Sequence, residues 1–317
     1  MLKEYGNMDI KQLRSFVTIS ETKNITKAAA LLNIVQPAVS RQIHLLEEEL
    51  GIELFERGRH GMHLTHEGKV LEGYARRALK EIEAAKIELT SSDGTLKGTI
   101  NIGILASLSE LLSVSLMRVI KKKYPEVNIK ITVGYSGHLK EWLESGDIDV
   151  ALIYGSVSSK FLDVQPIVRE QLWLIGPHDS DLSHHQPLSL EEVSVHPLIL
   201  PYAPHRLRTL IEQGFNQESC TLTIGAEIND LAVQKQLVKE GFGYTILPLV
   251  AMKNDLQQNS VKVAPINHPF FTRDIALALP NTRHISKLVH TIAQDIIYCS
   301  KVAVEVKAWL GGEWIGK

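Results

Sequence analysis

Apolar residues recur at three- and four-residue steps through positions 9–50, the spacing of short amphipathic helices. The pattern predicts helices over 9–21, 26–32 and 36–50, the second of them capped by Thr26. The inward stripe predicted for the third helix comprises Val39, Ile43, Leu46 and Leu50. The following segment, GIELFERGRHGMHLT, predicts two strands joined by a tight glycine-containing turn. A small helical domain that ends in a β-hairpin is therefore expected.

The third predicted helix has a polar face opposite its apolar stripe. Steps of four place Gln36, Pro37, Ser40, Arg41 and His44 on that face, near the start of the helix. Gln and Arg can bond base edges in the major groove, and Ser can hold a phosphate or a base edge. The face predicts a helix-turn-helix DNA reader. On spacing alone, a small helical domain with a solvated face remains an equal alternative.

A single long helical pattern runs from about Thr65 to Leu89. Its apolar seam is narrow, as in coiled coils, and the positions expected to contact a second chain are Leu71, Tyr74, Ala78 and Ile82. Dimerisation through this helix would present two reading heads to a dyad-symmetric site. The alternative is that the helix packs on its own domain.

Strands alternate with helices after a polar hinge at 90–99, a pattern typical of parallel βαβ units. Two sets of such units predict two α/β lobes, with two crossover strands and a cleft between them. The expected domains are a winged helix-turn-helix at 1–66, a dimerisation helix and hinge at 67–97, a two-lobed α/β domain with a cleft at 98–300 and a tail at 301–317. In the tail, Trp309 and Trp314 either pack on a neighbouring subunit or are disordered.

Ligands of open α/β lobes bind at strand C-termini and helix N-termini, where free N–H groups favour anions. The candidate effector-binding residues at such positions are Ala106, Ser107, Leu108, Ser136, Tyr154, Pro201, Tyr202, Asn229 and Thr245. For each of them, a turn or capping role is an equal alternative. Nearby, His205, Arg206 and Arg208 could supply a cation for a carboxylate effector, although solvated arginines are common.

The net charge of the chain gives no support to nucleic-acid binding, because the formal net charge of the 317 residues is −2. Cys220 and Cys299 lack disulfide or zinc spacing, and His184 and His185 lack a third metal ligand, so no metal or cofactor is expected. No nucleophile elbow, phosphate-binding loop or HExxH motif is present, which argues against an enzyme. The N-terminus lacks a signal peptide, so a cytoplasmic protein without a membrane partner is expected.

The segment RSFVTISETKNITKAAALLNIVQPAVSRQIHLLEEELGIELFERGRHGMHLTHEG resembles the winged helix-turn-helix of LysR-type transcriptional regulators. In GDIDVALIYG and LVKEGFGYTILP the second half is similar to the effector domain of that family, which shares its fold with periplasmic solute-binding proteins. PHRLR is similar to the branch that includes nitrogen-assimilation regulators. The DNA-contacting residues that the resemblance implies are Thr26, Gln36, Pro37, Ser40, Arg41 and, in the wing, Arg57. Val35 departs from the family's usual Ser or Thr, which removes a helix cap.

The resemblance implies a ligand-responsive regulator of transcription that binds dyad-symmetric double-stranded DNA. It implies a homodimer that pairs into a homotetramer, a small anionic effector in the cleft, and RNA polymerase as a further candidate partner. An architectural or nucleoid-type DNA-binding protein without a ligand response is the alternative. A regulator should prefer its own site by about a thousandfold, whereas an architectural protein should show little preference.

Overall fold

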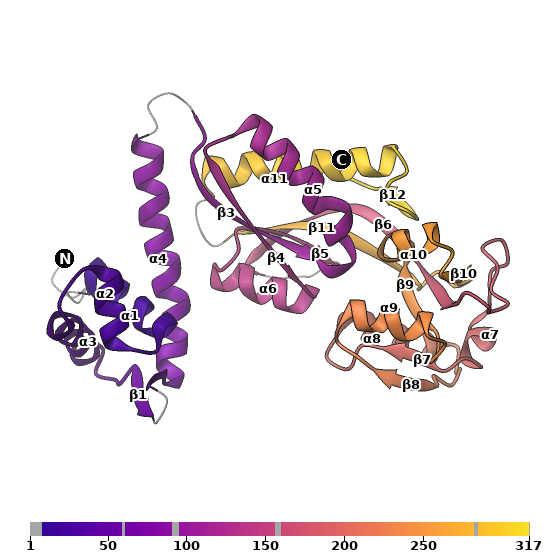
Figure 1. The fold of residues 1–317 in the computed structure, drawn as a ribbon, viewed down its shortest axis with the longest axis horizontal. Helices are drawn as coiled ribbons and strands as arrows, with labels where there is room; N and C mark the ends of the chain where they lie inside the picture. The colour runs from indigo at the N-terminus through magenta and orange to yellow at the C-terminus, as the bar shows by residue number, and fades with distance from the viewer. Residues whose placement is uncertain (1–7, 59–60, 91–94, 156–159, 282–284, 317) are drawn as a thin grey trace. The chain divides into compact units, whose positions relative to one another are not determined.

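The computed structural model describes residues 8–58, 61–90, 95–155, 160–281 and 285–316. The chain divides near Thr95 into two compact units, an N-terminal helical unit and a larger α/β unit (Figure 1). Among the described helices, none combines the length and apolar character needed to cross a membrane.

The N-terminal unit contains the predicted helices and hairpin. Its elements are α1 (Ile10–Thr22), α2 (Ile25–Leu32), α3 (Gln36–Leu50), β1 (Phe55–Gly58), β2 (Gly61–Leu64) and α4 (His66–Thr90). Two expectations were wrong. Asn24 rather than Thr26 caps α2, because its side chain accepts the Lys27 N–H at 3.0 Å, and Thr26 is exposed. Leu50 is 38% exposed, since it lies in the last turn of α3, directly before the left-handed Gly51 cap.

Hydrogen bonds from backbone N–H groups attach the hairpin and the residue before it to the helices. The Glu47 carboxylate of α3 accepts the Leu54 N–H at 2.8 Å, and the Met62 N–H donates to the Lys23 carbonyl at 3.0 Å. Gly61 has φ +111°, and a Cβ there would collide with that same carbonyl oxygen. Only glycine therefore lets the hairpin approach the α1–α2 turn this closely.

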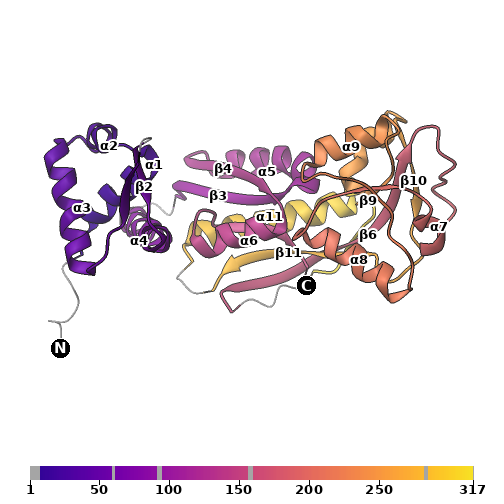
Figure 2. The ribbon, with the colours of Figure 1, turned by 90° about the horizontal axis from the view of Figure 1, so that it is seen from below.

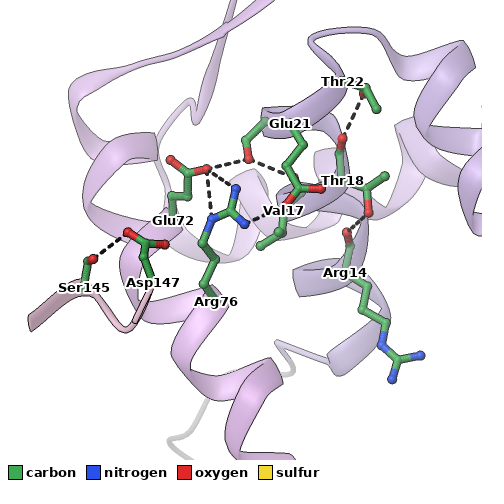
Figure 3. Close-up of polar contacts among 10 residues, drawn as sticks. Arg14, Val17, Thr18, Glu21, Thr22, Glu72, Arg76, Ser145 and Asp147 are labelled. Atoms are coloured by element: carbon green, nitrogen blue, oxygen red, sulfur yellow. Dashed lines mark hydrogen bonds and ion pairs between the residues drawn. The ribbon is translucent and has the colours of Figure 1, made fainter. Parts of the chain in front are cut away.

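The first half of α4 packs against α1. Arg76 bonds Glu21 at 2.6 Å and Glu72 at 2.8 Å, and Ser20 donates to the same Glu72 carboxylate at 2.7 Å (Figure 3). Ala75 is buried beside Leu71, Ala78 and Leu79, which are partly buried against the helical core. Leu71 and Ala78 therefore pack partly on their own domain, and each keeps some exposed surface. Tyr74 is 64% exposed, and Ile82 is partly buried.

The α/β unit has two lobes, each with its own apolar core. The first lobe has parallel strands β3 (Gly98–Leu105), β4 (Val127–Gly134) and β5 (Val150–Tyr154), and antiparallel β11 (Thr272–Pro280). Figure 1 shows α5 (Ser109–Lys123) and α11 (Lys287–Glu305) side by side on one face of this sheet, with α6 (Ser136–Ser145) on the other. The short 3₁₀ turn Ala106–Leu108 connects β3 to α5.

The second lobe repeats the alternation on a smaller scale. Its strands are β7 (Leu198–Leu200), β8 (Ile224–Glu227), β9 (Thr245–Pro248) and β10 (Val261–Pro265), and its helices are α7 (Leu190–Ser194), α8 (Arg206–Gln217), α9 (Leu231–Lys239) and α10 (Lys253–Gln257), with a 3₁₀ turn at Leu249–Met252. The long strand β6 (Leu162–Pro177) belongs to both lobes, because it pairs with β11 in the first and with β9 and β10 in the second (Figure 2).

The C-terminal tail is part of the first lobe. Strand β12 (Gly312–Trp314) pairs antiparallel with β6, and Trp309 is 2% exposed in the core. Both alternatives expected for the tail are wrong, since its tryptophan-containing segment packs in this chain. The apolar Trp309 and the free edge of β6 explain the docking.

Candidate functional site

The polar face predicted for α3 is exposed. Gln36, Pro37, Arg41 and His44 are exposed, and the Gln36 amide donates to the Ser40 hydroxyl one turn later, at 2.8 Å. His44 lies 3.2 Å from Glu48 on the following turn. Val35 occupies the N-cap without a side-chain bond, and the Ala38 N–H donates instead to the Val35 carbonyl at 3.0 Å.

The hairpin carries one further predicted DNA contact, Arg57. Arg57 lies in β1, paired with Met62 of β2, which puts it in the predicted wing. Its side chain and Arg59 lie outside the described residues.

A cavity of about 220 Å³ lies between the two lobes of the α/β unit. Six of the nine predicted effector-binding residues line it, namely Ala106, Ser107, Ser136, Tyr154, Pro201 and Asn229. They come from the ends of β3 and β5 and the start of α6 in the first lobe, and from the ends of β7 and β8 in the second. The strand-end argument therefore located the cavity correctly.

Three predicted residues do not line this cavity. Leu108 is fully buried in the core of the first lobe, because the 3₁₀ turn directs its side chain inward. Thr245 is fully buried in β9, where its hydroxyl donates to the Ile199 carbonyl at 2.8 Å. Tyr202 is 51% exposed. Its backbone N–H, rather than its side chain, donates a hydrogen bond to the Asn229 side chain at 3.0 Å.

Ser136 lines the cavity but has no proton to offer a ligand. Its hydroxyl accepts the Tyr154 N–H at 3.0 Å and donates to the Tyr154 carbonyl at 3.2 Å. A serine hydroxyl has a single proton. Ser136 therefore connects the start of α6 to the end of β5. This is a structural role, the alternative to ligand contact that the sequence also allowed.

Arg273 was not predicted, yet it sits at the cavity wall in β11. Its guanidinium bonds the fully buried Glu170 carboxylate at 2.6 Å and donates to the Ser107 hydroxyl at 2.8 Å. Because Ser107 accepts this bond, its own O–H is available to the cavity. Glu170 compensates the Arg273 charge, as a buried cation requires.

His205 is the N-cap of α8, where its Nδ1 accepts the Leu207 N–H at 3.2 Å. Burial, with smaller contributions from Arg273 and His138, lowers its pKa to about 4. The ring is therefore neutral near pH 7, with its proton on Nε2. That atom is buried at the cavity wall, without a hydrogen-bond partner in the described part of the chain.

The next residue, Arg206, also lines the cavity, with its guanidinium carbon 5.6 Å from the centre of the Tyr154 ring. Arg208 lies outside the lining and is instead paired with Glu212 and Glu227, at 2.6 and 2.7 Å. The Tyr135 ring meets His205 edge-on at 4.5 Å. The start of α8 in the second lobe thus contacts aromatic residues of the first.

A neighbouring cavity of about 360 Å³ shares Ser107, Tyr135 and Asn229 with the first. Its lining adds Glu110, Asp230 and Lys235, so both signs of charge are present. The smaller cavity is the better anion site, because donors and cations dominate its polar lining.

Comparisons with known proteins agree with this geometry. Residues 10–69 match the family description "Bacterial regulatory helix-turn-helix protein, lysR family", and residues 93–296 match "LysR substrate binding domain".

Relatives match along nearly their whole length. The chain is 30% identical to the uncharacterized HTH-type transcriptional regulator YvbU of Bacillus subtilis, over 91% of this chain and 99% of that protein. It is 25% identical to the nitrogen assimilation regulatory protein nac of Klebsiella aerogenes, over 92% and 94% of the two chains. The crystal structure of full-length CbnR with its target DNA shares the fold, with a TM-score of 0.67 at 19% identity, covering 92% of this chain and 99% of that one.

Proposed function

Because the chain belongs to the LysR family of bacterial transcriptional regulators, we propose that a small anionic effector in the interlobe cavity controls its binding to specific promoter sites. LysR-type regulators combine a DNA-binding helix-turn-helix with an effector-binding domain. The observation that carries the proposal is a cavity between two lobes whose polar lining consists mainly of hydrogen-bond donors. We propose a regulatory role without catalysis for this chain.

In the proposed DNA complex, α3 enters the major groove with its exposed face. Gln36, Ser40 and Arg41 read base edges, and Pro37 starts the helix at the groove. Thr26, exposed in the first turn of α2, and Arg57 of the wing contact phosphates. The exposure of Gln36 and Arg41 and the Gln36–Ser40 bond, which pre-orients both side chains, support this assignment.

We propose that the chain acts as a homodimer that pairs into a tetramer, and that α4 contributes to the dimer contact. Leu71 and Ala78 pack partly on their own domain, while Tyr74 is exposed and Ile82 is partly exposed. Further exposed apolar residues of α4 include Val70 and Leu89, at 53% and 86%. A promoter-bound tetramer in the bacterial cytoplasm would have RNA polymerase as a neighbour.

The effector would act through its unequal affinity for two arrangements of the lobes. The cavity is bounded by both lobes, so a bound ligand favours the arrangement that closes on it. The difference between the ligand's binding free energies for the two arrangements can then alter DNA affinity, and DNA binding must change effector affinity by the same factor.

Selection of binding sites from a random duplex pool by the full chain tests this function. A regulator should enrich a dyad-symmetric motif and prefer it over random duplex by about a thousandfold at fixed salt. Equal affinity for selected and random duplex would instead identify an architectural DNA-binding protein. Arg41→Ala is the matched variant for this titration, because it should reduce the preference and keep most of the salt-dependent background binding.

A further inference from the structure

We infer that the effector is a small monocarboxylate with an apolar body, whose carboxylate is held by His205 and Arg206 at the start of α8. The inference rests on the proposed function, since it specifies the ligand of that cavity. The ligand is assigned one negative charge and an apolar body, and His205 and Arg206 are assigned as the residues that recognise it.

The hydrogen-bonding groups of the cavity call for a ligand with acceptors. His205 offers a buried Nε2–H that is unpaired among the described residues, because its Nδ1 is occupied by the Leu207 N–H. Ser107 has its O–H to donate after accepting from Arg273, and Asn229 keeps its amide N–H groups after its oxygen accepts from Tyr202. A carboxylate supplies acceptors only and can satisfy these donors together.

The charges near the cavity indicate a single negative charge on the ligand. Arg273 is neutralised by Glu170 at 2.6 Å. Arg206 has no carboxylate partner within the described ranges, and its guanidinium is held beside the Tyr154 ring. One uncompensated cation matches one anion, whereas a second carboxylate would find no further unpaired cation among the described lining residues and would share the cavity with Glu141.

Placement on α8 strengthens the preference for an anion at this end of the cavity. Arg206 is the first residue of the 12-residue helix, and His205 is its cap, so the partial positive charge of the helix N-terminus acts at the same place. These groups come from the second lobe, while Tyr135 and Tyr154, their ring contacts, come from the first. A carboxylate bound here therefore contacts groups that already bridge the lobes.

The rest of the wall is apolar, which sets the body of the ligand. Its apolar side chains include Leu105, Leu207, Leu231, Leu247, Pro201, Pro204 and Pro248. A volume of about 220 Å³ lies below the roughly 300–1,000 Å³ of pockets for drug-sized ligands. A single ring or a short alkyl chain therefore fits the cavity better than a polar or extended metabolite.

Calorimetric titration of the full chain with four probes tests the inference. Benzoate and hexanoate carry one carboxylate and an apolar body, benzamide is the neutral match of benzoate, and succinate carries two carboxylates without an apolar body. The expected result is binding of benzoate and hexanoate, with benzamide and succinate weaker by about tenfold or more.

Two variants locate the carboxylate. Arg206→Gln should weaken benzoate by about tenfold or more, because it removes the charge. His205→Asn keeps an acceptor for the Leu207 N–H, so it preserves the cap and loses the Nε2–H donor; a weakening of about three- to tenfold is expected. Arg118→Gln is the control, since it removes the same charge from an exposed position on α5 and should bind benzoate as the parent does.

Each other outcome overturns a stated part of the inference. Equal binding of benzamide and benzoate would reject the charge, and succinate as the tightest probe would reject the single carboxylate; both would leave a ligand in the cavity and the proposed function intact. Failure of all four probes would reject the ligand class. Unchanged benzoate affinity in Arg206→Gln and His205→Asn would reject the assignment to α8. The proposed function fails separately, in the site selection, which uses no ligand.

Discussion

The Trp309 indole donates a 2.6 Å hydrogen bond to the Glu170 carboxylate, although 139 positions separate them in the chain. The other oxygen of that carboxylate accepts the bond from Arg273. Glu170 is fully buried, so both of its partners compensate a charge that is removed from water. The C-terminal segment thereby supports an arginine at the wall of the interlobe cavity.

Trp309→Phe should therefore destabilise the α/β unit. The change keeps an aromatic ring but leaves one oxygen of a buried carboxylate unpaired, which costs about 1–3 kcal/mol. Denaturant unfolding of the full chain measures the loss. Trp314→Phe is the control, because Trp314 is only partly buried in β12, and equal losses in the two variants would show that the bond to Glu170 is unimportant.

Arg41→Ala should weaken binding to the selected DNA site by about 1–3 kcal/mol, through loss of a base contact in the major groove. A mobility-shift titration at fixed salt gives the difference. Arg14→Ala removes the same charge from an exposed position on α1. If both variants bind alike, Arg41 does not read a base.

The double substitution Ile82→Glu and Leu89→Glu should dissociate the assembly, because it would place buried carboxylates without partners in the proposed α4 contact. Sedimentation velocity reports the oligomeric state. Leu31→Glu, on the exposed surface of α2, should sediment as the parent does. A double variant that keeps the parent's sedimentation coefficient would place the dimer contact elsewhere.

Ser107→Ala and Ser136→Ala should have different effects, although both residues line the cavity. Ser107→Ala should weaken benzoate by about three- to tenfold, since it removes an available donor. Ser136→Ala should lower the free energy of unfolding by about 1 kcal/mol, because both of its bonds to Tyr154 are lost. Calorimetry and denaturant unfolding of each variant check the contrast, which equal effects on benzoate affinity would contradict.

Stability should fall in acid through His205. Its pKa is about 4 in the fold and near 6.5 when exposed, so the unfolded chain binds more protons between these values. The stability that the neutral His205 ring contributes is present in full above about pH 6.5 and is lost as the pH falls toward 4. Unfolding measured at several pH values should show a shallower decline in His205→Asn than in the parent, and identical slopes would contradict the lowered pKa.

Local patterns predicted most of the elements correctly. Helices α1 and α3 were predicted within about one residue, because the apolar spacing of each is strong over its whole length. The first half of β6 and strand β10 were not predicted. Residues such as Gln165 and Glu170 interrupt the apolar pattern of β6, and long-range pairing with β11 and β12 makes this segment a strand.

The cavity was predicted better than its chemistry. Strand ends locate a cleft, since fold topology places them together, and this selected Ser107 and Asn229. A sequence does not show whether a hydroxyl already donates and accepts hydrogen bonds within the fold. Ser136, whose hydroxyl does both, was therefore indistinguishable from Ser107. Arg273 lies in a strand whose later residues are apolar, and its partner Glu170 is 103 positions away. The position of Arg273 shortly before the apolar residues of β11 was the one feature of the sequence that could have indicated it.

The shared strand β6 also sets the order in which the protein can mature during synthesis. The core of the N-terminal unit uses residues between Leu13 and Leu79, so it can form early, while most of the chain is still being translated. The first lobe must wait much longer, because β6 starts at Leu162 but its partners β11 and β12 start at Thr272 and Gly312. A nascent chain therefore acquires its DNA-reading surface well before the domain that regulates it.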